Sequence, residues 1–317
     1  MMKIAGSPGE GVRAAIGLTN YILRRNRVVY TNRKGDSRTV GDIRVTALDA
    51  GRFSLDGGTM FGVVPRSIWK KKIPPDGRNR IRLGLNCLLV ETGAETVLVE
   101  TGIGAAKLSP KYRDIYGADL SRSVIDALAE AGVAPETVDR VVLTHLHMDH
   151  AGGTTVRTED GFEPAFPNAR YTVQRQEWED ALGADRQTVR GYNAAPDLVP
   201  LERAGVLELV EGDAEVCPGV RTILTPGHTR AHQSVLIHSG GETVCFIGDL
   251  VPTRHHVHPV YIMAFDLYPR QTFKVRQRVL KRAAGEGWLM VWPHDPEQVW
   301  AYITIDDRGE FIPVEEL

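Results

Sequence analysis

The amino-acid sequence predicts an α/β fold in which two packed β-sheets are flanked by helices. Two observations lead to this prediction. From about Thr39 onward, apolar runs of strand length recur along the chain and fall into two groups, one in each half. Segments with helical periodicity lie between and outside these groups. Sheets must bury their faces against other layers, so this order of elements favours two sheets packed on each other with helices outside.

The first group of strand-like runs lies between residues 43 and 144. Ile43–Leu48 alternates apolar and polar residues, and Leu85–Gly102 holds two apolar runs joined by a Gly-Ala-Glu turn that indicates a hairpin. A helix is predicted within SVIDALAEAGVAP, because Ser123 can cap its start and Gly132 can end it after the last apolar residues. Val138–Thr144 is then a short buried strand that leads directly into a histidine cluster.

The second half repeats this arrangement. Four runs are strand-like: VLELV, VRTILTPG, QSVLIHSGGETVCFIGD and WLMVWP. The third of them contains Gly240-Gly241, which predicts a hairpin turn. A helix is expected at Thr272–Ala284, and the chain closes with a hairpin that turns at Asp307–Gly309.

Composition and charge narrow the classes of partner. The 317 residues are 42% hydrophobic and 25% charged, an ordinary globular mixture, and the net charge of −2 argues against a nucleic-acid partner bound by a basic surface. Cys87, Cys217 and Cys245 lie far apart, which favours reduced thiols in the cytoplasm. No apolar run reaches the roughly 18 residues needed to span a bilayer. We therefore expect a small-molecule partner and no membrane partner.

Residues 1–35 are predicted to form an N-terminal extension, and residues 36–317 a single domain. The extension contains VRAAIGLTNYILRRNR, in which the arginines follow the short apolar stretch. A signal peptide would carry its charge first, so we interpret the stretch as a helical arm, with export as the alternative. The oligomeric state is left open, a homodimer included.

The motif THLHMDH concentrates metal-ligating residue types at the end of a predicted strand. His145 and His147 are two residues apart, so their side chains point the same way on extended backbone. Asp149 and His150 follow, where Gly152-Gly153 allows a sharp turn. Imidazole and carboxylate groups are the ligands that Zn²⁺ and similar ions accept. A histidine-rich surface loop, the alternative, does not explain this position after a buried strand.

Three further candidates stand in comparable places. His228 follows VRTILTPG, Asp249 follows ETVCFIG, and His294 follows WLMVWP. Each comes directly after a strand-like run, beside a proline or glycine that can bend the backbone. We therefore expect these three side chains to meet the THLHMDH cluster at one edge of the sheets.

The pattern H-x-H-x-D-H, followed by a separate His, Asp and His, resembles the metallo-β-lactamase superfamily from about Thr39 to the C-terminus. The resemblance implies a four-layer αββα sandwich of two mixed β-sheets, with metals held by loops at one edge. The ligand sets it implies are His145, His147 and His228 for the first metal, Asp149, His150 and His294 for the second, and Asp249 for both. Since every position is filled, two divalent ions are expected, with Zn²⁺ first among Zn, Mn, Fe, Co and Ni. His232 is expected to support a ligand or to lie at a sheet edge, and not to bind metal itself.

Two stretches, LDGGTMFGVVPRSIWKK and GDLVPTRHHVHPVYIMAFDLYP, are similar to the quorum-quenching N-acyl-homoserine lactonases of that superfamily. The likeness implies that Met60, Phe61 and Val64 line an apolar groove for the acyl chain. The alternative is that they are core side chains. The expected reaction is opening of a lactone ring by a metal-bridging hydroxide, whose pKa two metals lower toward about 7.

The sequence departs from the lactonase pattern at two positions. Pro252 stands where a tyrosine is usual, three residues after the bridging aspartate, so the proton donor must come from elsewhere. His255 and Tyr261 are the leading candidates, beside Asp149 and Asp249 as catalytic ligands. Glu100 stands where an aspartate is usual, and we expect it to support a ligand histidine.

Other activities are compatible with the same ligands, because function depends on the pocket and not on the fold. The nearest alternative is an arylesterase or an organophosphate hydrolase of the methyl-parathion type. An iron-dependent oxidoreductase fits less well, since the single-iron dioxygenases do not need all seven ligands. A non-catalytic scaffold is the remaining alternative.

Overall fold

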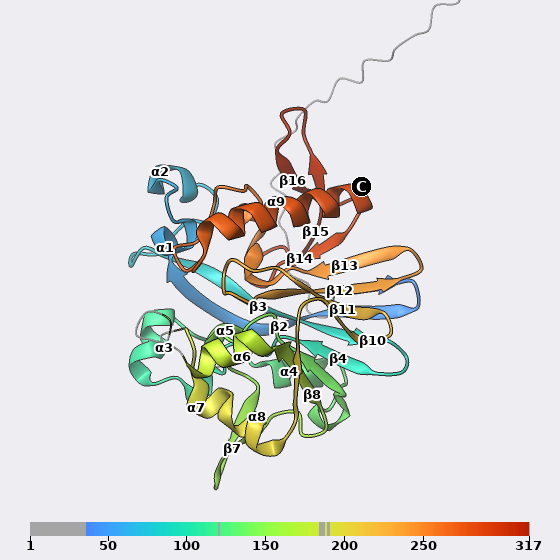
Figure 1. Ribbon diagram of the computed structural model, residues 1–317. Coiled ribbons are helices and arrows are strands. Elements are labelled where there is room, and N and C mark those ends of the chain that lie inside the picture. The colour runs from blue at the N-terminus through green and yellow to red at the C-terminus, as the bar shows by residue number, and fades with distance from the viewer. Residues whose placement is uncertain (1–35, 120, 184–187, 189–190, 317) are drawn as a thin grey trace, which may run out of the picture. The chain divides into compact units, whose positions relative to one another are not determined.

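Two seven-stranded mixed β-sheets lie one above the other in the computed structural model, with helices on the outer side of each (Figure 1). The structure describes residues 36–119, 121–183, 188 and 191–316. The predicted N-terminal extension, residues 1–35, lies outside the described residues. The predicted four-layer sandwich is confirmed. Within the described ranges, no helix is long and apolar enough to cross a membrane.

The first sheet has the strand order β1-β2-β3-β4-β5-β8-β9. Its strands are β1 (Ser37–Val40), β2 (Ile43–Asp56), β3 (Arg80–Glu91), β4 (Thr96–Val99), β5 (Arg140–Val142), β8 (Arg170–Gln174) and β9 (Leu207–Val210). The pairs from β1 to β4 are antiparallel, and those from β4 to β9 are parallel. The predicted hairpin within Leu85–Gly102 is formed by β3 and β4.

The second sheet has the order β10-β11-β12-β13-β14-β15-β16. Its strands are β10 (Ala214–Cys217), β11 (Val220–Leu224), β12 (Gln233–Ser239), β13 (Glu242–Phe246), β14 (Leu289–Val291), β15 (Trp300–Ile305) and β16 (Phe311–Val314). Only β13 and β14 pair in parallel among these strands. A small separate hairpin is made by β6 (Thr155–Thr158) and β7 (Gly161–Pro164).

The described helices connect the strands. They are α1 (Gly57–Phe61), α2 (Arg66–Trp69), α3 (Pro110–Tyr116), α4 (Val124–Glu130), α5 (Met148–Ala151), α6 (Arg175–Leu182), α7 (Ala194–Asp197), α8 (Val199–Ala204) and α9 (Pro269–Glu286). Helix α4 begins after Ser123 as predicted, in a capping box with Asp126. Helix α9 contains the predicted Thr272–Ala284 and is longer at both ends.

Three apolar clusters correspond to the three interfaces between the four layers. The cluster between the sheets joins side chains of β2, β3 and β4, such as Val45 and Leu88, to side chains of β12 and β13, such as Val235 and Phe246. A second cluster packs the first sheet against its helices, and a third packs the second sheet against α9. Burial of apolar surface on both faces of each sheet holds the layers together.

Strand direction brings the candidate ligands to one edge. β11 and β13 are both antiparallel to β12, and β14 is parallel to β13, so the three strands end at the same edge of the second sheet. His228, Asp249 and His294 follow these ends. Asp249 sits in a short 3₁₀ turn, Gly248–Leu250, directly after β13. The segment after β5, together with the start of α5, carries THLHMDH to the same place.

Candidate metal centre

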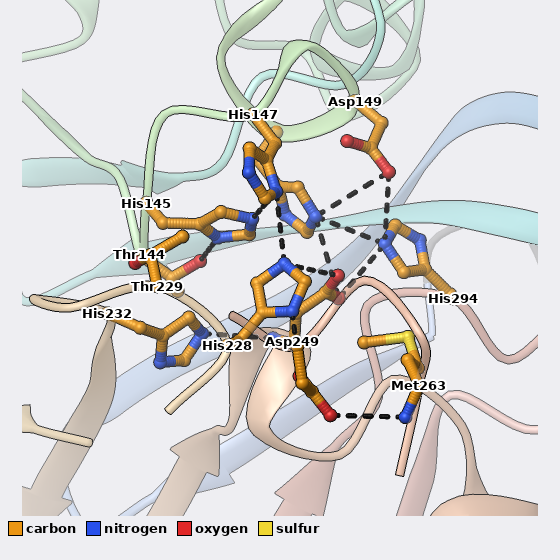
Figure 2. Close-up of polar contacts among 12 residues, drawn as sticks. Thr144, His145, His147, Asp149, His228, Thr229, His232, Asp249, Met263 and His294 are labelled. Atoms are coloured by element: carbon orange, nitrogen blue, oxygen red, sulfur yellow. Dashed lines mark hydrogen bonds and ion pairs between the residues drawn. The ribbon is translucent and has the colours of Figure 1, made fainter. Parts of the chain in front are cut away.

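The seven side chains expected to bind metal lie together at this edge, and Figure 2 shows the polar atoms of the six that it labels facing one another. Their ligand atoms form three groups, each within 4.8 Å. The groups are His145, His147 and His228; His145, His150 and Asp249; and Asp149, His150 and His294. Five of the seven side chains are buried, and His147 and Asp149 are half-buried.

One half of the centre is built from three imidazoles. Nδ1 of His147 lies 3.0 Å from Nε2 of His145 and 3.0 Å from Nε2 of His228. Three ring nitrogens that face one point are typical of a shared cation. Zn–N bonds of 2.0–2.1 Å in a tetrahedron separate the ligand atoms by about 3.3 Å, which is close to these distances.

The other half holds two imidazoles and a carboxylate. Nε2 of His294 lies 3.1 Å from Nε2 of His150 and 3.5 Å from Oδ2 of Asp149. The separation between His150 Nε2 and Asp149 Oδ2 is 3.7 Å. A second ion fits among these three atoms by the same geometric argument.

Asp249 lies between the halves. Its Oδ2 is 3.4 Å from His228 Nε2, and its Oδ1 is 3.1 Å from His294 Nε2. The Oδ1 atom is buried and accepts no hydrogen bond from the part of the chain that the structure describes. An ionised oxygen in that state is costly, and a bound cation would remove the cost. The donor set therefore fits two metal ions bridged by Asp249.

The remaining ring nitrogens of four of these histidines have partners of their own. The pairs are His145 Nδ1 with Thr144 Oγ1 at 3.0 Å, His150 Nδ1 with Glu100 Oε2 at 3.1 Å, His228 Nδ1 with Asp266 Oδ1 at 2.9 Å, and His294 Nδ1 with the Gly84 carbonyl at 2.9 Å. Such contacts set the ring orientation and leave the other nitrogen to face the centre of the cluster, where a metal could bind. The prediction that Glu100 supports a histidine of the cluster is confirmed.

His232 is confirmed in a supporting position. The backbone N–H of Asp249 donates to His232 Nε2 at 3.0 Å, so the imidazole holds the turn that carries Asp249. Gly248 has a φ of 60°, and a Cβ there would lie 2.5 Å from the same Nε2. Only glycine fits this close approach. Asp266 was not predicted, because nothing local in its loop sequence indicates that it returns to His228.

Burial and neighbouring charges divide the imidazoles into two types. Burial lowers the pKa of His145 and of His147 well below the ordinary value, so both rings are neutral at pH 7, the form that can bind a metal. Burial acts in the same direction on His150. There the carboxylates of Asp149 and Glu100 outweigh it and raise the pKa of His150 well above the ordinary value.

A cavity of about 390 Å³ opens onto the cluster. Its polar wall includes His147, Asp149, His228, Asp249 and His294. The rest of the wall is largely apolar and contains Phe53, Leu55, Met60, Tyr116, Met148, Met263, Ala264, Phe265 and Leu267. Met263 is drawn beside the cluster in Figure 2. The cavity can therefore take an elongated apolar group while a polar group faces the seven side chains.

Residues 81–294 match the family described as the metallo-beta-lactamase superfamily, which is more than half of the chain. The chain belongs to this superfamily. It is 28% identical over 229 residues to the N-acyl homoserine lactonase AiiA of Bacillus thuringiensis subsp. kurstaki, covering 69% of this chain and 84% of AiiA. The predicted superfamily is thereby confirmed, and the protein is a superfamily hydrolase that resembles the quorum-quenching branch.

Solved structures of hydrolases are similar to this chain in fold. A probable metal-dependent hydrolase from Staphylococcus aureus is 30% identical, with a TM-score of 0.78, over 88% of this chain and 100% of that one. An N-acyl homoserine lactone hydrolase with the product N-hexanoyl-L-homoserine at its catalytic metal centre is 25% identical, with a TM-score of 0.61, over 82% of this chain and 96% of that one.

The three residues that the lactonase likeness assigned to the acyl groove separate in the structure. Met60 lines the cavity. Phe61 points elsewhere and stacks between Trp69 and His256, while Val64 is buried in the same apolar cluster. Successive residues of a helix point about 100° apart, so α1 cannot turn both Met60 and Phe61 toward one cavity. For Phe61 and Val64 the observed position is the core.

The structure does not bring the two expected proton donors to the cavity wall. His255 lines a separate surface pocket with Lys72 and Arg254. Burial, with help from these two cations, lowers the pKa of His255 to about 3, so its ring holds no acidic proton at pH 7. Tyr261 packs its ring edge against Phe61. Pairing of Arg254 with Asp295 holds the loop in this position.

A tyrosine that the sequence did not indicate lies on the wall instead. Tyr116, the last residue of α3, lines the cavity and stacks on Tyr112. It belongs to a helix more than a hundred residues before Asp249, and no motif spacing connects the two.

Proposed function

We propose that this protein is a dinuclear-metal hydrolase that opens the lactone ring of N-acyl-homoserine lactones. One observation carries the proposal: the Asp249 carboxylate reaches toward both halves of the centre, with Oδ2 3.4 Å from His228 Nε2 and Oδ1 3.1 Å from His294 Nε2. The similarity to AiiA supports the choice of lactones among the esters.

In this proposal His145, His147 and His228 hold one ion, and Asp149, His150 and His294 hold the other, with Asp249 between them. Zn²⁺ is the first candidate, since histidine and carboxylate ligands suit it. When bound, the two ions supply Lewis-acid polarisation of the ester carbonyl and activation of water near neutral pH. The chain's own carboxylates at Asp149 and Asp249 remain ionised ligands, which leaves neither as the proton donor.

The apolar part of the cavity supports an acyl substrate. Met60, Met263 and Phe265 stand on the wall next to the ligands, where an aliphatic chain would leave water as the lactone meets the centre. Methionine side chains are flexible and adapt to chains of different length. We propose Tyr116 in place of His255 and Tyr261 as the side chain that donates a proton to the leaving alkoxide, since it is a phenol on this wall.

The test is one preparation assayed against three substrate classes, with its metal content measured. N-acyl-homoserine lactones, an organophosphate triester and a β-lactam are compared by kcat/KM, and metal is counted by elemental analysis. We expect two ions per chain and the highest kcat/KM for the lactones. A preference for the triester would replace the proposal with the organophosphate hydrolase alternative. Failure to bind metal would exclude both the lactonase and the organophosphate hydrolase.

A further inference from the structure

A buried carboxylate behind the metal centre has no part in the proposed ligand set. Glu177 lies in the first turn of α6, with 0% of its surface exposed. No lysine or arginine of the described ranges forms an ion pair with it. A buried carboxylate without a cationic partner is costly and needs hydrogen-bond donors around it.

Three donors from three separate segments meet this carboxylate. The backbone N–H of Leu146 donates to Oε1 at 3.1 Å, and the hydroxyl of Tyr192 donates to the same oxygen at 3.2 Å. The hydroxyl of Thr229 donates to Oε2 at 2.6 Å. All three donor residues are buried. Glu177 therefore ties these segments to the start of α6.

The three segments that donate to Glu177 each carry or cover a histidine of the three-histidine half of the centre. Leu146 stands between His145 and His147, and Thr229 directly follows His228. The ring of Tyr192 lies 5.0 Å from the ring of His147.

Among the described residues, Nε2 of His147 has no hydrogen-bond partner, and Gly191 and Tyr192 lie beside its ring. The four other histidines of the centre have hydrogen-bond or ion-pair partners for their second ring nitrogen, as described above. His147 is covered by Gly191 and Tyr192: a Cβ on Gly191 would lie 2.6 Å from His147 Cδ2, and Met148 N–H donates to the Gly191 carbonyl at 2.9 Å. Glu177 anchors Tyr192 and so the cover over His147.

We propose that Glu177 is a positioning residue for the three-histidine half of the centre, so that its loss selectively weakens the ion held by His145, His147 and His228. The inference rests on the proposed dinuclear centre. The other half is oriented by different groups: Glu100 on His150 and the Gly84 carbonyl on His294. None of the three bonds of Glu177 reaches those segments.

Glu177→Gln is the central variant, because glutamine keeps the size of the side chain and replaces one acceptor oxygen with a donor. We expect it to lower Zn²⁺ affinity at the three-histidine half by about 10–100-fold, the usual effect of losing a group that orients a ligand. Affinity is measured by competition with a chromophoric chelator. Thr229→Val, which keeps the carboxylate and removes one bond, should give a smaller loss in the same direction.

Two backgrounds tell the halves apart. In a His294→Ala background, which removes a ligand of the other half, Glu177→Gln should release the remaining ion. In a His228→Ala background it should leave the affinity for the remaining ion unchanged. If Glu177→Gln lowers the metal affinity equally in the two backgrounds, the proposed selectivity is wrong. It is also wrong if Glu177→Gln keeps both ions at the chelator concentration at which wild type keeps both.

Asp197→Asn is the matched control for losing a buried carboxylate. Asp197 is also buried, but its carboxylate pairs with Lys107 and bonds Asn193, and it takes no bond from Leu146, Tyr192 or Thr229. It should lower thermal stability while both ions stay bound. Loss of an ion from this control would assign the Glu177 effect to general loosening. If Glu177→Gln does not fold, Thr229→Val in the same two backgrounds decides the question. A wild-type protein without two ions would refute the proposed centre itself.

Discussion

Asp266 Oδ1 lies 2.9 Å from Nδ1 of His228, and both side chains are buried. Asp266 also accepts the backbone N–H of Met263 on its other oxygen, at 3.1 Å. One carboxylate thus orients a ligand histidine and holds the loop that forms part of the cavity wall. The position of His228 and the shape of the substrate cavity are therefore linked.

Asp266→Asn should weaken metal binding by about 10–100-fold, since an amide orients the imidazole less firmly than a carboxylate does. The same variant should raise KM, because the loop around Met263 loses an anchor. Metal affinity by chelator competition and a lactone titration measure the two effects. Asp306→Asn, on an exposed turn, serves as the control. Wild-type metal affinity in Asp266→Asn would contradict the orienting role.

Asp249→Ala should lose most of the bound metal and nearly all hydrolysis, because the side chain between the two halves is removed. Elemental analysis and initial rates with a homoserine lactone provide the measurement. Full lactonase activity in this variant would exclude a two-metal mechanism.

Metal uptake should release protons at pH 7. Burial opposes protonation of His150 and His228, but neighbouring carboxylates outweigh it and raise the pKa of both, that of His150 well above the ordinary value, so the metal-free protein holds protons there more firmly than a free imidazole does. A metal must displace those protons, and its affinity therefore rises with increasing pH. Calorimetric titrations with Zn²⁺ in two buffers of different ionisation enthalpy count the protons. Identical heats in both buffers would show that none is released.

Tyr116→Phe should lower kcat by about 10²-fold for alkyl lactones, the usual contribution of a general acid. The loss should be smaller for esters with activated leaving groups, which need little protonation. His255→Ala should slow neither class, because His255 lines a different pocket. Leaving-group series on both variants separate the two residues. A selective loss in His255→Ala would restore the donor that the sequence suggested.

Met60→Trp should reduce kcat/KM for long-chain substrates about tenfold relative to short-chain ones, because the larger side chain fills the cavity. A chain-length series of N-acyl-homoserine lactones measures the ratio. An unchanged ratio would place the acyl chain elsewhere.

Elements and site residues could be predicted from the sequence where a few consecutive residues indicate both the local structure and its chemistry. The run Val138–Thr144 with H-x-H-x-D-H indicated both a strand end and ligand chemistry, and Ser123 marked the start of α4 correctly. Glu100 could be expected behind a histidine because it stands where the superfamily that the sequence resembles has an aspartate in that role. Phe61 and Val64 could not be distinguished from Met60 in this way, since apolar residues of one loop look alike until their directions are known.

Periodicity and residue chemistry are properties of short segments, so the four-layer architecture and the seven side chains at its edge could be predicted from the sequence. The groups that stand behind those seven, and the groups that line the cavity, became known from the structure. Asp266, Glu177 and Tyr116 come from loops and helices far from the motif along the chain. Their positions follow from how long connections fold back on the sheets, and no local pattern encodes that.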